Sequence, residues 1–306
     1  AGDITKKLLT ATLDQPANLR KVYDGTTAAD ADNLKIAGAF ERDSLTYDKT
    51  AVYSDANATI NPGAASQNAR NIIYTSTLGG VDAGNYAFDA LGANTKTLQA
   101  TGDIEKRKVY ARVTNDPVTK KYDGTTNVLI GGAVPTNKDA YVTFGKSSNA
   151  AEAATTGLVG GYGTNETTAA YQNSDAGKNK QVTYTLAIGG DDGNGHAFKD
   201  NYVIYDAAHP TNMVQTLTTH QNVIDKSALR INAGIADKQY DGTKDVKGLA
   251  TILSLTGAPS GIDILAGYSG EYLDANVNEM GVDYKGIRLS GTGAANYTLA
   301  YGGNDL

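Results

Sequence analysis

A six-residue pattern, Lys-x-Tyr-Asp-Gly-Thr, constrains the fold of this chain more than any other feature of its sequence. Its three copies begin at Lys21, Lys120 and Lys238. An Ile-x-Lys triplet precedes each copy, and an Asn-Tyr pair follows each copy near the end of its repeat. Landmarks that recur in one order are the sequence signature of repeated structural units. The chain is therefore predicted to contain three homologous units.

The Ile-x-Lys triplets set the boundaries of these units. They define repeat 1 as residues 1–103, repeat 2 as residues 104–223 and repeat 3 as residues 224–306, the last expected to be truncated at its C-terminal end. No Pro-rich or Ser-rich linker separates the repeats. Flexible or spacer linkers have such compositions, so their absence predicts stiff, end-to-end stacking into an elongated monomeric rod.

The alternation of apolar and polar residues predicts strands. In VTYTLAI, the side chains of Val182, Tyr184, Leu186 and Ile188 share one face, as in a half-buried strand. Further candidate strands lie at residues 7–13, 45–53, 72–78, 109–113, 141–144, 228–231 and 297–301. No segment shows the 3.6-residue period of a long amphipathic helix. The sequence predicts an all-β protein of small modules, which are either sandwich-like or β-grasp-like.

The recurring motifs are interpreted as turns that fix strand register and not as a binding site. Glycine accepts a positive φ, and an aspartate carboxylate accepts hydrogen bonds from nearby amides, so Asp-Gly between strand-forming residues favours a tight turn. The tyrosine is expected to cover the edge of a small core. The turn residues are Tyr23, Asp24 and Gly25, Tyr122, Asp123 and Gly124, Tyr240, Asp241 and Gly242, and the pairs Asn85 and Tyr86, Asn201 and Tyr202, and Asn296 and Tyr297.

These motifs resemble the YDG-type repeat of filamentous-haemagglutinin-like bacterial exoproteins, many of which are exported by two-partner secretion. The resemblance rests on Lys-x-Tyr-Asp-Gly-Thr, on DAGNYAF at Asp82 and ANYTLAY at Ala295, and on the Ile-x-Lys triplets, and it covers essentially all 306 residues. It implies an extracellular adhesin segment that serves as a stalk or as an adhesive surface. The implied partners are glycans or proteins of host cells or matrix, or neighbouring bacteria in a biofilm. The family supplies no catalytic or ligand-binding residue.

Composition argues against several function classes. The net charge of −6 and the pI of about 5.1 give no electrostatic basis for binding nucleic acid. Since no apolar run approaches about 18 residues, insertion of this segment into a membrane is not expected. The chain has no cysteine, which rules out disulfides and thiol catalysis. Without a constellation of acid, base and nucleophile, no enzymatic activity is expected.

No cofactor or metal is expected, although calcium stays an open alternative. The segment DDGN at Asp191 is superficially similar to a calcium loop, but it lacks the spaced carboxylates and the closing glutamate of an EF-hand. All three histidines lie in repeat 2 and do not have the spacing of metal ligands.

Repeat 2 carries an insertion near residues 146–173. Its two marker aspartates, Asp139 and Asp175, are 36 residues apart, against 12 for Asp43 and Asp55 in repeat 1 and 11 for Asp263 and Asp274 in repeat 3. Long loops often carry recognition, and aromatic residues among small polar ones are typical contact residues. Tyr162 and Tyr171 are therefore the candidate binding residues, and an unconstrained surface loop is the alternative interpretation.

Two further alternatives stay open at this point. The chain could be a carbohydrate-binding module of a larger secreted protein, with exposed tyrosines as sugar platforms. The same aromatic exposed in every repeat would favour that function, whereas a tyrosine buried in every repeat would favour a structural module. The repeated lysines and asparagines could also form covalent Lys–Asn bonds, although solvated turn residues are the simpler interpretation.

Overall fold

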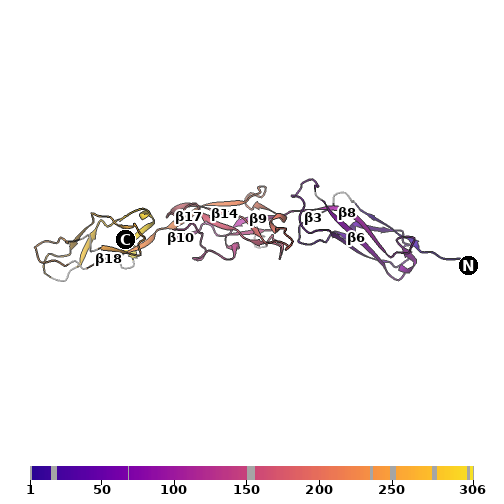
Figure 1. Cartoon of the computed structure of the whole chain (residues 1–306), viewed down its shortest axis with the longest axis horizontal. Helices are drawn as coiled ribbons and strands as arrows, with labels where there is room; N and C mark the ends of the chain where they lie inside the picture. Colours follow the sequence, from indigo (N-terminus) through magenta and orange to yellow (C-terminus); the bar gives the residue numbers. More distant parts are fainter. Residues whose placement is uncertain are drawn as a thin grey trace. The chain divides into compact units, whose positions relative to one another are not determined.

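The computed structural model describes residues 2–14, 19–67, 69–149, 156–234, 237–248, 253–277, 281–301 and 304–305. These residues form short strands joined by turns (Figure 1). Among them the longest helical segment is a single four-residue 3-10 turn at Phe198–Asn201. The prediction of an all-β protein is confirmed. No helix in the described part of the chain has the length and apolarity needed to span a bilayer.

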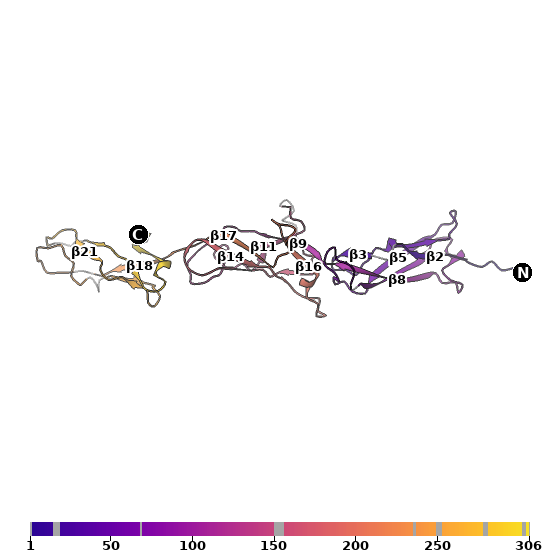
Figure 2. The ribbon, with the colours of Figure 1, turned by 90° about the horizontal axis from the view of Figure 1, so that it is seen from above.

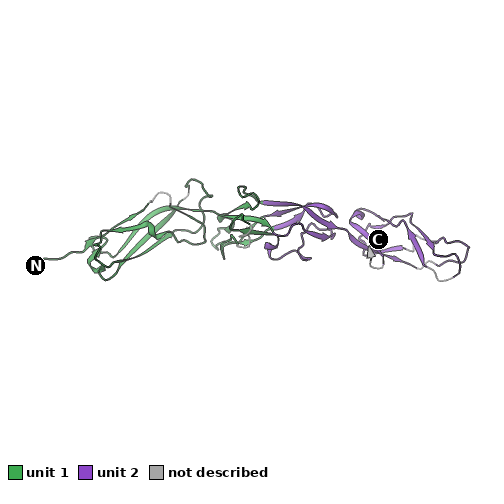
Figure 3. Cartoon of the chain, turned by 180° about the vertical axis from the view of Figure 1, so that it is seen from behind, with its two compact units in different colours: residues 1–113, 142–167, 186–215 green, residues 114–141, 168–185, 216–306 purple. Residues whose placement is uncertain are grey.

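The chain separates into two compact units (Figure 3). Unit 1 contains residues 1–113, 142–167 and 186–215, and unit 2 contains residues 114–141, 168–185 and 216–306. Each unit therefore holds one terminal repeat together with part of repeat 2.

Unit 1 is built on a four-stranded sheet in the order β3-β8-β6-β5. These strands are Leu19–Val22, Thr95–Glu105, Arg70–Gly79 and Thr46–Tyr53, respectively. Strand β1 (Lys7–Leu8) pairs with β7 (Tyr86–Ala87), and β2 (Thr10–Leu13) pairs with β4 (Leu34–Ala37). A three-stranded sheet contains β11 (Val142–Gly145), β9 (Arg107–Val113) and β16 (Tyr202–Asp206), and β12 (Thr164–Asn165) pairs with β15 (Ile188–Gly189).

Unit 2 contains a second four-stranded sheet, in the order β10-β17-β14-β13. These strands are Thr119–Lys121, Thr216–Asp225, Gly177–Thr185 and Thr168–Tyr171, respectively. A third four-stranded sheet has the order β19-β18-β24-β25, with strands Leu253–Thr256, Ser227–Ala233, Tyr297–Tyr301 and Asn304–Asp305. Figure 2 labels β18 of this sheet. Two further ladders join β20 (Asp263–Ile264) to β23 (Leu289–Ser290) and β21 (Ser269–Tyr272) to β22 (Val282–Lys285).

Strand β6 illustrates how the sequence pattern produces the sheets. Ile72, Tyr74 and Leu78 are buried, while Ile73 and Thr77 between them are exposed. Complete burial of an aliphatic side chain contributes about 1.5–3 kcal/mol to stability. A one-residue shift of register would expose several such side chains and lose their contributions. The alternation predicted for β6 and for Val182, Tyr184, Leu186 and Ile188 is confirmed.

Strands β8 and β17 lie in segments for which the sequence analysis predicts no strand. Both segments connect one repeat to the next and are largely polar, yet they form strands of 11 and 10 residues. Both strands begin with threonines at alternate positions, Thr95 and Thr97 in β8 and Thr216 and Thr218 in β17, and threonine suits a pleated, half-buried surface although it is polar. Strand β8 continues past residue 103, and β17 continues past residue 223. Each Ile-x-Lys triplet that follows a repeat therefore completes the sheet of that repeat.

The Asn-Tyr pairs start strands that run parallel to the first strand of the same repeat. Tyr86 lies opposite Lys7, Tyr202 opposite Arg107, and Tyr297 opposite Ser227. Each of these partners lies three residues after the isoleucine of an Ile-x-Lys triplet. The two motifs therefore meet in the same register in all three repeats, although the number of residues between them differs.

Candidate functional site

Each Tyr-Asp-Gly turn is closed by a hydrogen-bond network among a lysine, an aspartate and a threonine. Lys120 Nζ donates to Asp123 Oδ1 at 2.6 Å and to the Thr125 carbonyl oxygen at 2.7 Å. The Thr125 amide and hydroxyl donate to the same carboxylate oxygen at 2.9 and 2.8 Å. The glycine of each turn has a φ between +76° and +80°. Equivalent bonds join Lys21, Asp24 and Thr26 in repeat 1 and Lys238, Asp241 and Thr243 in repeat 3.

The lysines of these turns are not solvated. Their side chains are 15%, 2% and 12% exposed in repeats 1, 2 and 3. Each Nζ also lies 5.3–5.8 Å from the centre of a tyrosine ring, which is a cation–π distance. The rings belong to Tyr53, Tyr171 and Tyr272. The expectation of solvated turn lysines is wrong, because each ammonium bonds to the aspartate of its own turn.

The turn aspartates are stabilised in their ionised form. Burial of Asp123 opposes ionisation, but hydrogen bonds from Lys120 and Thr125 outweigh it and lower the pKa of the carboxyl group. The pKa of Asp24 is lowered by the same balance. For Asp241 the bond from Lys238 is the largest contribution, and it also lowers the pKa. Because these charges are paired within the turn, the network closes the loop without leaving a free ionic group to bind a ligand.

The tyrosine of each Tyr-Asp-Gly turn in repeats 1 and 2 packs against the Asn-Tyr tyrosine of the following repeat. In unit 1, Tyr23 is 1% exposed and meets Tyr202 edge-on, with 5.5 Å between ring centres. Arg107 adds a hydrogen bond of 3.3 Å from Nη1 to the Tyr23 carbonyl oxygen. In unit 2, Tyr122 meets Tyr297 in the same way at 5.2 Å. The two motifs are therefore contact partners across a repeat junction.

The asparagine beside each of these tyrosines makes a second junction contact. The Ala58 amide donates to Asn201 Oδ1 at 2.7 Å, and Asn201 Nδ2 donates to Asn57 Oδ1 at 2.8 Å. In unit 2, the Ala176 amide donates to Asn296 Oδ1 at 2.8 Å, and Asn296 Nδ2 donates to Asp175 Oδ1 at 3.2 Å. Asn201 and Asn296 are buried, so the expectation of solvated asparagines is wrong for them, whereas Asn85 is exposed.

The junction asparagines bind a short turn that recurs in all three repeats, here named the Asx turn. Its sequences are DANA at 55–58, NSDA at 173–176 and DANV at 274–277. The first side chain accepts a hydrogen bond from the amide two residues later, at 2.7, 3.2 and 3.3 Å, respectively. This geometry aligns Asn173, and not Asp175, with Asp55 and Asp274. The repeat-2 counterpart of Asp55 is therefore Asn173, and the sequence analysis is wrong by two residues in choosing Asp175.

Tyr171 is not available as a surface anchor. It lies in β13, is 3% exposed, and donates through its hydroxyl to the carbonyl oxygens of Val118 and Val223, both at 3.2 Å. Its ring lies beneath the turn lysine, as the ring of Tyr53 does in repeat 1. The prediction that it binds a partner is corrected, because the residue belongs to the core that all repeats share.

Tyr162 lies on the Tyr-Asp-Gly turn of repeat 1. Its ring meets Tyr23 edge-on at 6.5 Å and Phe198 at 5.6 Å, and the residue is 36% exposed. A Cβ added to Gly25 would lie 2.6 Å from Tyr162 Cδ2, so this contact requires glycine in the turn. The insertion therefore adds a third aromatic ring to the first junction. Residues 150–155 of the insertion lie outside the described residues.

The loop that begins at Asp191 is closed by hydrogen bonds from its own backbone amides. Asp192 accepts hydrogen bonds from the amides of Asn194 and His196 at 2.8 and 3.1 Å. The bond from Asn194 is the main reason that the pKa of Asp192 is lowered to about 2. Among the residues that the structure describes, no three histidine, aspartate or glutamate side chains cluster closely enough to hold a metal ion.

A family comparison agrees with the recurrence of these motifs. The model of the YDG domain matches residues 5–97 and 225–303, which together are more than half of the chain. The chain belongs to the YDG domain family. The two matched YDG segments correspond to repeats 1 and 3, while residues 98–224, with the insertion, lie outside the match. A search of curated proteins found no match to this YDG chain.

Proposed function

We propose that this YDG chain is a repetitive extracellular module of a large bacterial surface adhesin of the filamentous-haemagglutinin-like, two-partner-secreted type. Its three tandem modules stack into a rod that serves as a stalk and as an adhesive surface for host cells, matrix or biofilm. One observation carries the proposal. The Tyr-Asp-Gly tyrosine of one repeat packs on the Asn-Tyr tyrosine of the next, and this happens at two successive junctions.

Complementary ends are the property that an array of repeats needs. A repeat that presents the Tyr-Asp-Gly turn and the Asx turn at one end and the Asn-Tyr pair at the other can contact its neighbours on both sides. Stability in such arrays is the sum of the stability of each repeat and of the interfaces between neighbours. An array of this kind provides reach, and weak contacts distributed along it add through multivalency.

The burial of the tyrosines favours this structural function over a carbohydrate-binding module. Tyr23, Tyr86 and Tyr202 are buried, and Tyr53 and Tyr171 lie beneath the turn lysines. A sugar platform needs an exposed aromatic face, and none of these five residues provides one.

Small-angle X-ray scattering of the whole chain tests the stacking. A compact globule of this length would have a radius of gyration of about 19 Å. A stacked array is expected to give a clearly larger radius of gyration and a cross-section no wider than one repeat. A radius of gyration near the compact value would show that the repeats do not stack end to end.

Adhesion needs a separate test, namely binding of the whole chain to glycans, matrix proteins and intact bacteria. The matched variant replaces residues 150–155 with a Gly-Ser linker and retains Tyr162 and Tyr171, because removing all of residues 146–173 would delete a core residue. Loss of binding in this variant would place the adhesive surface in the insertion. Absence of binding by both proteins would restrict the chain to the stalk function.

A further inference from the structure

In repeats 1 and 2, the strand that leads into the Tyr-Asp-Gly turn runs parallel to the last strand of the same repeat. Along its whole length, β3 pairs with the C-terminal part of β8, and β10 pairs in the same way with β17. The tyrosine amide extends each ladder, from Tyr23 to the Glu105 carbonyl oxygen at 2.9 Å and from Tyr122 to that of Asp225 at 2.7 Å. This parallel ladder, here named the clamp, thus occurs twice in the same form.

The two strands of the clamp are loaded in opposite directions when the chain is stretched. The chain passes through β3 early in repeat 1 and leaves the repeat at the C-terminal end of β8. Tension therefore draws β3 toward its N-terminal end and β8 toward its C-terminal end. Because the strands are parallel, the two pulls act along the ladder. Ladder hydrogen bonds lie across the strands, so sliding strains all of them at once, whereas peeling breaks them one at a time.

The Tyr-Asp-Gly turn obstructs the sliding of β3. Lys21 Nζ, which comes from β3, donates to the Asp24 carboxylate and to the Thr26 carbonyl oxygen, both at 2.7 Å. Beyond the turn, the Thr27 carbonyl oxygen accepts a hydrogen bond of 2.7 Å from the amide of Tyr53 in β5. Strands β3 and β5 are the two edges of one sheet. The turn thus fastens β3 to the opposite edge, and β3 can slide only if this network opens.

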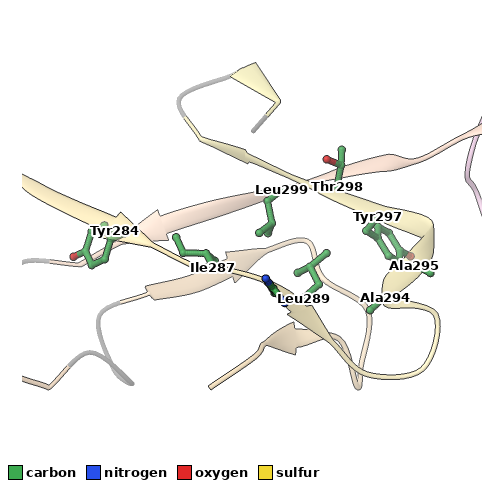
Figure 4. Close-up of a pocket in the computed structure, with 9 residues that line it drawn as sticks. Tyr284, Ile287, Leu289, Ala294, Ala295, Tyr297, Thr298 and Leu299 are labelled. Atoms are coloured by element: carbon green, nitrogen blue, oxygen red, sulfur yellow. The ribbon is translucent and has the colours of Figure 1, made fainter. Parts of the chain in front are cut away.

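The first strand of each repeat has a parallel partner as well. Strand β1 pairs with β7, β9 with β16 and β18 with β24. Apolar side chains reinforce this pairing. In repeat 3, Ile231 of β18 and Leu299 of β24 belong to one apolar cluster, and Leu299 and Ile287 line a cavity of about 500 Å³ (Figure 4). Side-chain packing therefore holds the first strand in addition to its backbone hydrogen bonds.

We propose that the clamp bears tension along the chain, and that the Lys-x-Tyr-Asp-Gly-Thr motif is a stop that prevents β3 from sliding past β8. This rests on the proposed stalk function, because a stalk is held at one end and loaded at the other. Resistance to forced unfolding is set by the unfolding rate and not by equilibrium stability alone. The motif recurs once in every repeat because every repeat of a stalk carries the same load.

Unfolding of repeat 1 under constant force, within the whole chain, tests the clamp. Because the sequence has no cysteine, handles can be attached to introduced cysteine pairs. Lys6→Cys with Lys106→Cys pulls the two strands along the ladder, here named the shear geometry. Val22→Cys with Lys106→Cys pulls them apart at one end, since Val22 lies opposite Glu105, and this is the peeling geometry.

Unfolding at the same force is expected to be slower in the shear geometry by a factor on the order of 10, because several hydrogen bonds must break together. Equal rates in the two geometries, or slower unfolding in the peeling geometry, would overturn the proposal.

Asp24→Ala tests the motif as a stop. It removes the carboxylate that accepts from Lys21 Nζ and from the amide and hydroxyl of Thr26. Unfolding in the shear geometry should become faster by a factor on the order of 10, and unfolding in the peeling geometry should change little. Asp48→Ala, at an exposed position of β5, is the matched control and should leave both rates unchanged. If Asp24→Ala does not fold, Thr26→Val removes the hydroxyl alone and should act in the same direction.

Other outcomes overturn the proposal in distinguishable ways. Equal acceleration of both geometries by Asp24→Ala would refute the stop, since the aspartate would then support the folded state in general. An Asp24→Ala protein that unfolds like the control would refute it too. Equal rates in the two geometries with an elongated particle in scattering would remove the clamp and keep the stacking. Slower unfolding in the shear geometry with a compact particle would do the reverse.

Discussion

Replacing Tyr23 by alanine should open the first repeat junction and little else. The ring is 1% exposed and lies between Tyr202 and Tyr162, with ring centres 5.5 and 6.5 Å away. Removing a buried aromatic side chain costs about 3–5 kcal/mol, because transfer energy is lost and a cavity is left. The two edge-on contacts are part of that cost, at about 0.5–1.5 kcal/mol each.

The chain provides its own control for this substitution. Tyr240 occupies the same position in the turn of repeat 3 but is 62% exposed. Tyr240→Ala should therefore change stability by no more than about 0.5 kcal/mol. Both substitutions leave the lysine, aspartate and threonine of the turn in place, so the difference between them reports the junction contact.

Hydrogen exchange measured by mass spectrometry is the appropriate assay, because an array of repeats need not unfold in a single two-state step. A loss of about 3 kcal/mol in the free energy of opening makes amide exchange faster by a factor on the order of 100. Peptides that cover residues 19–25 and 202–206 should show this increase in the Tyr23→Ala protein. An effect below about 1 kcal/mol, or equal effects of Tyr23→Ala and Tyr240→Ala, would refute the assignment of the tyrosine to the junction.

Three further predictions follow from the repeated geometry. Asn201→Ala should lower the free energy of unfolding by about 1–3 kcal/mol, because the Ala58 amide loses its hydrogen-bond acceptor, whereas Asn85→Ala should lower it very little. Thermal denaturation compares the two variants, and equal melting temperatures would contradict the junction hydrogen bond. Gly25→Ala should be more destabilising than Gly124→Ala, since both positions have a positive φ but only the first contacts a tyrosine ring, and equal unfolding midpoints in urea would count against that contact. The lowered pKa values of the turn aspartates stabilise the fold above their unfolded pKa of about 3.9, and this stability is lost as the pH falls through the lower folded values. Calorimetry should show melting temperatures that fall below about pH 4, and a constant melting temperature down to pH 2 would exclude this linkage.

The sequence predicts the local structure of this protein well, because strand alternation and turn chemistry act over a few residues. Strand β6 and the positive φ of Gly25 both follow from such short-range rules. Strands β8 and β17 were missed because their alternating residues are threonines, which do not stand out as apolar. The threonines at alternate positions near the start of each segment were the available indication of a strand.

The candidate site was less predictable, because its contacts join residues that are far apart in the chain. Tyr23 and Tyr202 are separated by most of two repeats, and no local pattern states that they meet. The sequence places Tyr171 in the insertion because it pairs Asp175 with Asp55, whereas the hydrogen bonds of the Asx turn pair Asn173 with Asp55, two residues earlier. The burial of the turn lysines was indicated only by the three-residue spacing between each lysine and its aspartate, which suits an ion pair.

The continuation of β8 into the Ile-x-Lys triplet has a consequence for how such chains can change in length. Because Ile104 completes one sheet and the next strand starts at Arg107, the segment that can be inserted or lost without breaking a sheet runs from one Ile-x-Lys triplet to the next. A genetic duplication with its breakpoints there would add one whole unit, and both ends of that unit would match the surfaces of its neighbours. Breakpoints elsewhere would leave one sheet short of a strand and a neighbouring sheet with an extra one.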